Sequence, residues 1–175
     1  GGSVGVMIRP HDRVALGASY RNDGHLGIER DTIRIAETDL PASWSLGLRW
    51  QPSTKASMAV AYEGKNWSAS DRDIKQQGGI GAENAYRVSG GVELLRDLRN
   101  PGHLPVRLGA NYGTLPFPVR VGNQPHEFGV SLGTGVRFTG GRGGLDLAVQ
   151  QLWRSDGGGF SERATVITFG VSIRP

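Results

Sequence analysis

Hydrophobic and polar residues alternate along most of the chain. In the stretch SWSLGLRW (residues 43–50), large apolar side chains take every second position, and Ser, Gly and Arg lie between them. Successive side chains of a β-strand point to opposite faces, so this alternation predicts a strand with one apolar face. The pattern recurs in nine segments, at residues 3–9, 13–22, 42–51, 56–67, 84–96, 105–113, 126–139, 144–154 and 163–174. It predicts an all-β chain of antiparallel strands in one domain.

The connections between the predicted strands alternate in length. Short turn signals lie at residues 10–12, 52–54 and 140–143, and a somewhat longer one lies at residues 98–104. Longer, polar and Gly-rich loops are predicted at residues 23–41, 68–83, 114–125 and 155–162. Outer-membrane barrels have short turns on the periplasmic side and long loops outside the cell. The layout therefore predicts an up-and-down transmembrane β-barrel.

The polar positions of the predicted strands contain few of the residues that are typical of a solvent-exposed face. Gly, Ala and Ser dominate them, whereas the solvent face of a soluble sandwich is richer in Lys, Glu, Thr and Gln. Aromatic residues lie at or near the strand ends, as in the interfacial girdles of membrane barrels. They are Tyr20, Trp44, Trp50, Tyr62, Trp67, Tyr86, Tyr112, Phe138 and Trp153. We therefore expect the apolar face to meet lipid and the other face to line a lumen; a soluble carbohydrate-binding β-sandwich is the alternative.

Composition narrows the possible functions further. The formal charge is +4, but the 20 basic residues are scattered, so nucleic acid is not an expected partner. The chain has no cysteine and no apolar run long enough for a transmembrane helix. The four histidines show no metal-ligand spacing, and no nucleophile motif is present. We expect no catalytic centre, no metal site and no cofactor.

Four sequence segments match motifs of one known protein family and occur in the same order along the chain. LPASWSLGLRW (40–50) matches a Leu-Pro-small-Ser/Thr-Trp entry into a descending strand, and ENAYRVSGGVEL (83–94) matches an Asp/Asn-Ala-Tyr-Arg strand. VRLGANYGTLPFP (106–118) matches an Arg-x-Gly-x-x-Tyr strand with a Pro-containing loop, and HEFGVSLGTGVRF (126–138) matches the descending strand after it. In this order the chain resembles the FadL/TodX family of outer-membrane transporters for long-chain fatty acids and other hydrophobic compounds.

This resemblance implies a barrel of fourteen strands plugged by an N-terminal hatch. Residues 1–175 correspond to the C-terminal part of that barrel, so five further strands and the hatch are expected upstream. The end of the chain departs from the usual pattern, because it reads Ile173, Arg174 and Pro175 instead of ending in an aromatic residue.

The family resemblance also implies the function. We expect passive, non-enzymatic passage of hydrophobic small molecules, such as long-chain fatty acids, across the outer membrane of a Gram-negative bacterium. The expected partners are the ligand, outer-membrane lipid and the barrel-assembly machinery. The alternative within the same fold is a structural anchor in a secretion or surface-attachment complex, with an unknown protein partner.

Charged residues on the predicted lumen face are the candidate ligand contacts. If residues 42–51 run towards the periplasm, six of these charges fall near the periplasmic end: Arg49, Glu93, Arg107, Arg137, Asp146 and Arg174. Glu93 and Arg107 lie on neighbouring strands, as do Arg137 and Asp146, and such pairs stabilise by about 0.2–1 kcal/mol. They form either a structural ladder or a ring that contacts the hatch or a ligand carboxylate. The predicted ligand-contact residues are Arg87, near the outer end, and Glu93, Arg107, Asn111 and Arg137.

Overall fold

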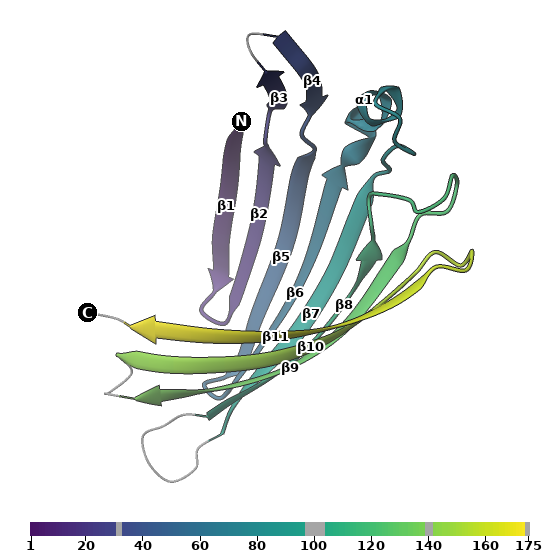
Figure 1. Cartoon of the computed structure of the whole chain (residues 1–175). Coiled ribbons are helices and arrows are strands. Elements are labelled where there is room, and N and C mark those ends of the chain that lie inside the picture. Colours follow the sequence, from purple (N-terminus) through teal and green to yellow (C-terminus); the bar gives the residue numbers. More distant parts are fainter. Residues whose placement is uncertain (31–32, 97–103, 139–141, 174–175) are drawn as a thin grey trace.

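A computed structural model describes residues 1–30, 33–96, 104–138 and 142–173. Its main feature is one antiparallel sheet of nine strands (Figure 1). In spatial order they are β1 (Gly2–His11), β2 (Val14–Asn22), β5 (Ala42–Ser53), β6 (Ala56–Asn66), β7 (Ala85–Arg96), β8 (Leu104–Thr114), β9 (His126–Phe138), β10 (Gly143–Ser155) and β11 (Ser161–Ile173). The prediction of an all-β, up-and-down chain with nine such strands is confirmed. Residues 98–103, 139–141 and 174 of the predicted turns and strand ends lie outside the described residues.

The sheet is curved and open. Strands β1 and β11 form its two edges, and among the described residues they do not pair with each other. Figure 1 shows the strands fanning around a bend, with the long connections at one end of the sheet and the short β1–β2 and β5–β6 turns at the other. An open, curved sheet is what part of a barrel looks like. The upstream strands that would pair with its edges stay a prediction.

Two of the predicted loops contain short elements that the sequence analysis did not predict. The β2–β5 connection holds the hairpin β3 (His25–Arg30) and β4 (Ile33–Asp39), which forms a separate two-stranded sheet. The β6–β7 connection holds a 3-10 turn (Trp67–Ala69) and the helix α1 (Asp71–Gln76). Each hairpin strand carries only two alternating apolar residues, and the helix is shorter than two turns, so neither gives a clear periodic signal. No helix in the described part of the chain is long and apolar enough to cross a membrane.

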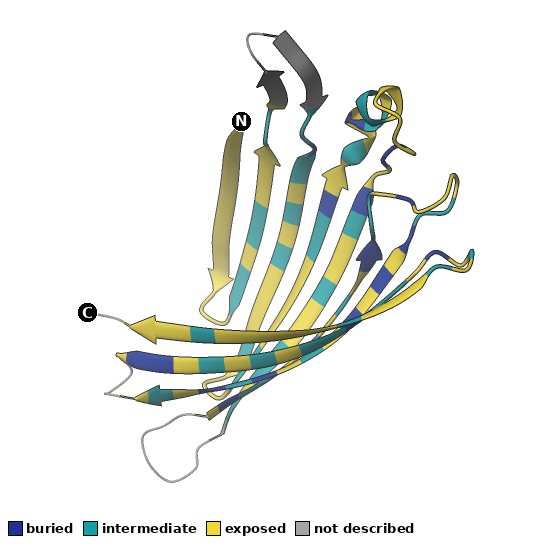
Figure 2. Ribbon diagram, viewed as in Figure 1, coloured by how far each residue is buried: buried dark blue, intermediate teal, exposed yellow. Residues whose placement is uncertain are grey.

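The strand register gathers the apolar side chains on one face. Leu48, for example, lies opposite Leu16 on one side and Val60 on the other. We call this the outer face; it includes Val6, Leu16, Leu46, Val60, Leu108, Leu132 and Ile167. These side chains are 38–70% exposed, and among the described residues only Ala82, Ala85 and Leu152 are buried hydrophobic residues. Figure 2 shows β1 exposed along its whole length.

This exposure argues against a soluble sandwich. A sandwich buries its apolar face against a second sheet about 10 Å away, and no layer of the described chain covers this one. An uncovered apolar face across nine strands is far larger than the isolated apolar residues that a soluble surface carries. Lipid is the environment that such a face suits.

Stacked aromatic rings line the long-loop end of the outer face. Trp44 stacks on Tyr62 with ring centroids 5.0 Å apart, and Tyr86 continues the row at 6.2 Å from Tyr62. This row is typical of an interfacial girdle. Trp67, which the sequence analysis grouped with it, instead packs edge-on against Phe117 of another loop, 4.8 Å between centroids. Trp67 differs because the chain leaves the strand at Asn66.

Candidate functional site on the inner face

The inner face carries the side chains that alternate with the apolar ones, and it differs between two halves of the sheet. We call β1, β2, β5 and β6 the N-terminal half, and β7 to β11 the C-terminal half. Charged side chains in the C-terminal half form two networks, one near each end of the strands. Small side chains dominate the N-terminal half and leave hollows.

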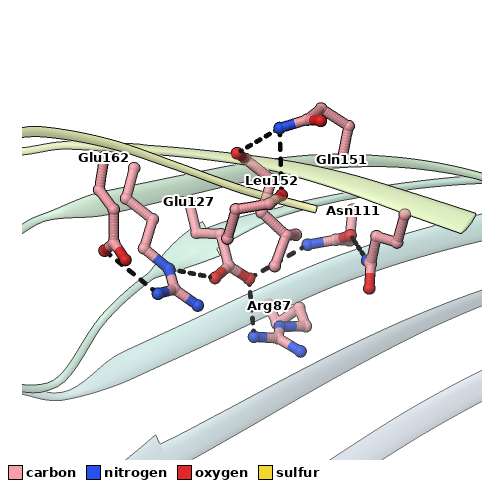
Figure 3. A network of polar contacts seen from close by, with 9 residues as sticks. Arg87, Asn111, Glu127, Gln151, Leu152 and Glu162 are labelled. Carbon is pink, nitrogen blue, oxygen red and sulfur yellow. Dashed lines mark hydrogen bonds and ion pairs between the residues drawn. The ribbon is translucent and has the colours of Figure 1, made fainter. Parts of the chain in front are cut away.

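The first network, the long-loop belt, is centred on Glu127 of β9. One carboxylate oxygen accepts from Arg87 Nη2 at 3.0 Å and the other from Arg154 Nε at 2.8 Å. Arg154 also contacts Glu162 at 3.3 Å. Asn111 donates to Glu127 at 3.5 Å, and Figure 3 shows Arg87 and Asn111 converging on this carboxylate. Only 5% of the Glu127 side chain is exposed, so the belt holds a buried carboxylate between two cations.

A glycine on the intervening strand makes this contact possible. Arg87 on β7 lies opposite Gly113 of β8, and Gly113 in turn lies opposite Glu127. The guanidinium therefore passes over a residue with no side chain. A Cβ at Gly113 would collide with the Tyr86 carbonyl oxygen, so this position requires glycine.

The second network, the short-turn belt, is centred on Arg107 of β8. Arg107 contacts Glu93 at 2.5 Å and Asp146 of β10 at 2.7 Å, and Arg137 contacts the other oxygen of Asp146 at 2.9 Å. The Arg107 side chain reaches over β9, where Gly135 lies opposite Asp146. Two neighbouring-strand pairs are thus joined into one chain of four alternating charges.

The structure brings the predicted contact residues together in these two belts. Glu93, Arg107 and Arg137 pair as their strand positions predicted, and Arg87 and Asn111 join the long-loop belt. Arg49 stands apart, because its Nε donates to the Ser57 hydroxyl at 3.3 Å. Arg174 lies outside the described residues. Direct ligand contact by the five predicted residues stays a prediction.

Sequence reasoning did not select three members of the long-loop belt: Glu127, Arg154 and Glu162. A signal was available for the first two. Pairing residues 126–138 with 143–155 as a hairpin places Glu127 opposite Arg154. The contact between Arg87 and Glu127 skips a strand, so no hairpin register reveals it.

The N-terminal half offers open space on the same face. Its mid-strand positions are small, and the hydroxyls of Ser19 and Ser45 hydrogen-bond across neighbouring strands at 2.8 Å. Above them lies a hollow of about 330 Å³, which we call the inner hollow. Its lining includes Ser19, Arg21, Ser45, Glu63, Arg87 and Ser89.

A second hollow, of about 160 Å³, lies at the long-loop end, and we call it the mouth hollow. Its lining includes Lys65, Trp67, Tyr86, Arg87, Leu115 and Pro116. Arg87 lines both hollows, and half of its side chain is exposed. A guanidinium has five N–H donors, and Arg87 uses one of them in its hydrogen bond to Glu127. The others are left for a ligand.

The rim of the mouth hollow is held by hydrogen bonds between two loops. The Glu83 amide donates to the Pro116 carbonyl at 2.8 Å, and Gln124 Nε2 donates to the Asn84 carbonyl at 2.7 Å. Asn84 Oδ1 accepts from the Ser68 amide at 2.9 Å. These bonds fix the 67–84 and 115–125 loops to each other, so the hollow is built by the chain rather than left by loose loops.

Two aspartates order the loops beyond the strands. The Asp71 carboxylate pairs with Lys75 at 2.8 Å and accepts from the Ala82 amide, and both contacts lower its pKa. The buried Asp156 accepts from the amides of Phe160 and Gly158, which lowers the pKa of that carboxyl group. In the described part of the chain, no group of three His, Cys, Asp or Glu side chains is placed to hold a metal ion.

Comparisons with known proteins bear on the fold. No family model matches the chain, and no curated protein matches it. Among solved structures, the chain is similar to the CymD monoaromatic hydrocarbon channel, with a TM-score of 0.67 and 13% sequence identity. The similarity covers 99% of this chain and 51% of that one, so the chain spans about half the length of that channel. What the two share is the fold.

Proposed function

We propose that the chain forms part of the wall of an outer-membrane barrel through which hydrophobic small molecules pass without chemical change. The observation that carries this proposal is the division of the sheet into an exposed apolar face and an inner face with hollows. The fold shared with a hydrocarbon channel supports it. The ordered motifs support membership of the FadL/TodX family, and with it a fourteen-stranded barrel, an upstream hatch and insertion by the barrel-assembly machinery.

The passage runs along the N-terminal half in this proposal. A ligand enters the mouth hollow, passes Arg87 and continues over the small side chains of β2, β5 and β6. Burial of apolar surface contributes about 25 cal/mol per Å², so an acyl chain needs few polar contacts. Arg87 is the group that meets the polar end of a ligand, and long-chain fatty acids are the proposed class.

Transport by the full-length protein in liposomes tests the proposal. We expect faster entry of labelled palmitate and of labelled toluene than in liposomes without protein. Arg87→Gln should slow palmitate, which carries a carboxylate, more than toluene, which does not. Arg72→Gln is the matched control, because Arg72 is exposed on α1 and lines neither hollow. Entry of both compounds at the protein-free rate would contradict the proposal.

A further inference from the structure

The short-turn end of the N-terminal half carries an unusual group of cations. Arg9 of β1, Arg13 of the β1–β2 turn and Arg49 of β5 line one hollow of about 160 Å³. Asp12 is the one acidic residue in this lining, whose other members are Val14, Ala15 and Gln51. We propose that this hollow is an oxyanion site that binds a compact carboxylate or phosphate from solution.

The strand register shows how the arginines are arranged around Ala15. Ala15 of β2 lies opposite Arg49 of β5. On the other side of β2, Arg9 belongs to the stretch between Ile8 and His11, where the β1–β2 register shifts. The strands that carry Arg9 and Arg49 are therefore two strand spacings, about 10 Å, apart, with the small Ala15 on the strand between them. The long-loop belt uses a similar arrangement, with Gly113 lying between Arg87 and Glu127.

The charges differ between the two arrangements. In the belts the side chains that reach over the small residue are opposite in sign and form an ion pair. Here both are arginines, so they repel each other. An anion above Ala15 would take the bridging place that Glu127 and Asp146 occupy in the belts.

The three arginines have the donors for such an anion. Within the described residues none of them forms an ion pair; Arg13 Nη1 donates to the Pro52 carbonyl and Arg49 Nε to the Ser57 hydroxyl, both at 3.3 Å. All three residues are exposed in the described part of the chain, which leaves their remaining N–H groups unused by it. Guanidinium groups bind carboxylate and phosphate through two parallel hydrogen bonds, which sets the ligand class.

The site is distinct from the belts that use arginine for structure. Arg107 and Arg137 have Glu93 and Asp146 as partners, whereas the hollow has three cations for one carboxylate. Its position at the short-turn end separates it from the mouth hollow and from Arg87. The proposal therefore stands whether or not the chain transports hydrophobic compounds.

Titration of the full-length protein in detergent with inorganic phosphate, and separately with acetate, tests the site. Calorimetry should show one saturable site, and Arg49→Gln should weaken binding at least tenfold. Arg49→Lys keeps the charge but loses the planar fork, so an intermediate loss is expected. Arg142→Gln, which removes an exposed arginine at the same end but outside this hollow, should leave binding unchanged.

Two outcomes would overturn the proposal. Equal affinity in wild type and Arg49→Gln would show that the arginines do not form the site. An equal loss in Arg142→Gln would show a response to net charge instead of a built site. Unchanged near-ultraviolet circular dichroism of each variant confirms that the comparison is made on folded protein.

Discussion

The two halves of the sheet share one outer face but differ on the inner face. Across both halves the outer side chains are apolar and exposed, with Val60 at 54% and Leu108 at 50%. On the inner face the C-terminal half is crossed by ion pairs, whereas the N-terminal half carries serines, alanines and glycines around hollows. The two halves therefore have the same kind of outer surface, but their inner surfaces differ in charge and in open space.

This difference separates two uses of glycine in a strand. In the C-terminal half a glycine leaves room for side chains that bridge over it, as at Gly113 and Gly135. In the N-terminal half a Cβ at Gly17 or Gly47 would have its nearest neighbour 3.9 Å away, so these glycines leave space that no side chain fills. The same residue type thus makes room for ion pairs in one half and leaves a hollow in the other.

The largest expected effect tests the shared outer face. Val60→Arg and Leu108→Arg should each cost about 2–4 kcal/mol of folding free energy, because both place a charge in hydrocarbon near mid-strand. Urea unfolding of the full-length protein in lipid vesicles measures the loss. Similar losses in the two halves confirm a common lipid-facing surface. A loss below about 0.5 kcal/mol in either variant would mean that this face does not meet lipid there.

The next effect tests the inner faces against each other. Glu127→Gln should cost about 3 kcal/mol, because it leaves two arginines without their buried carboxylate. Both arginines are partly exposed, so we expect the low end of the range for a broken buried pair. Denaturant unfolding in micelles measures the change.

Glu63 provides the matched control for this variant. It lies opposite Arg87 in the same row, but 42% of its side chain is exposed and its ion pair is with Lys65 at 3.3 Å. Exposed pairs contribute about 0–1 kcal/mol, so Glu63→Gln should be nearly neutral. Equal losses in Glu63→Gln and Glu127→Gln would remove the distinction between the halves.

A smaller effect tests the two uses of glycine. Gly135→Ala should cost about 1–3 kcal/mol, because the added methyl would lie 2.8 Å from the Leu145 carbonyl and against the Asp146 carboxylate. Gly47→Ala should change stability by less than about 0.5 kcal/mol. Thermal unfolding in one detergent compares them, and a costly Gly47→Ala would show that the N-terminal half is also tightly packed.

Strands and faces were predictable from the sequence because each is a local property. Alternation over ten residues defines a strand, and the register of a hairpin places Arg137 diagonally across from Asp146 without further information. The same reasoning predicted the pair of Glu93 and Arg107. These features depend only on period two and on the position of the turn.

The belts and hollows depend on the curvature of the sheet, which no local pattern encodes. Contacts such as Arg87 to Glu127 join strands that are not neighbours, and their partners are 40 residues apart. The mouth hollow likewise requires two loops to pack together through Glu83 and Pro116. The β3–β4 hairpin and α1 were missed for another reason, since each hairpin strand has only two alternating apolar residues and the helix is shorter than two turns.

The smallest effect concerns the loops and distinguishes two ways to hold a carboxylate. Asp71 depends first on an exposed pair with Lys75, whereas Asp156 is buried and depends on the amides of Phe160 and Gly158. Both pKa values are lowered below 3.8, so each contact stabilises its loop fully above that pH. The contribution is lost as the pH falls through the lowered pKa, because protonation removes the favoured charged form.

Salt should affect these two aspartates differently. Raising ionic strength from about 0.1 M to about 1 M shortens the screening length from about 10 Å to about 3 Å. The pKa of Asp71 should therefore rise towards 3.8, while that of Asp156 should change less, because short hydrogen bonds from backbone amides are screened little. Carboxyl carbon shifts in NMR spectra of the full-length protein, followed against pH at both salt concentrations, measure the two values. Equal shifts with salt would show that Asp156 depends on the charge of nearby Arg120 instead of on its amide donors.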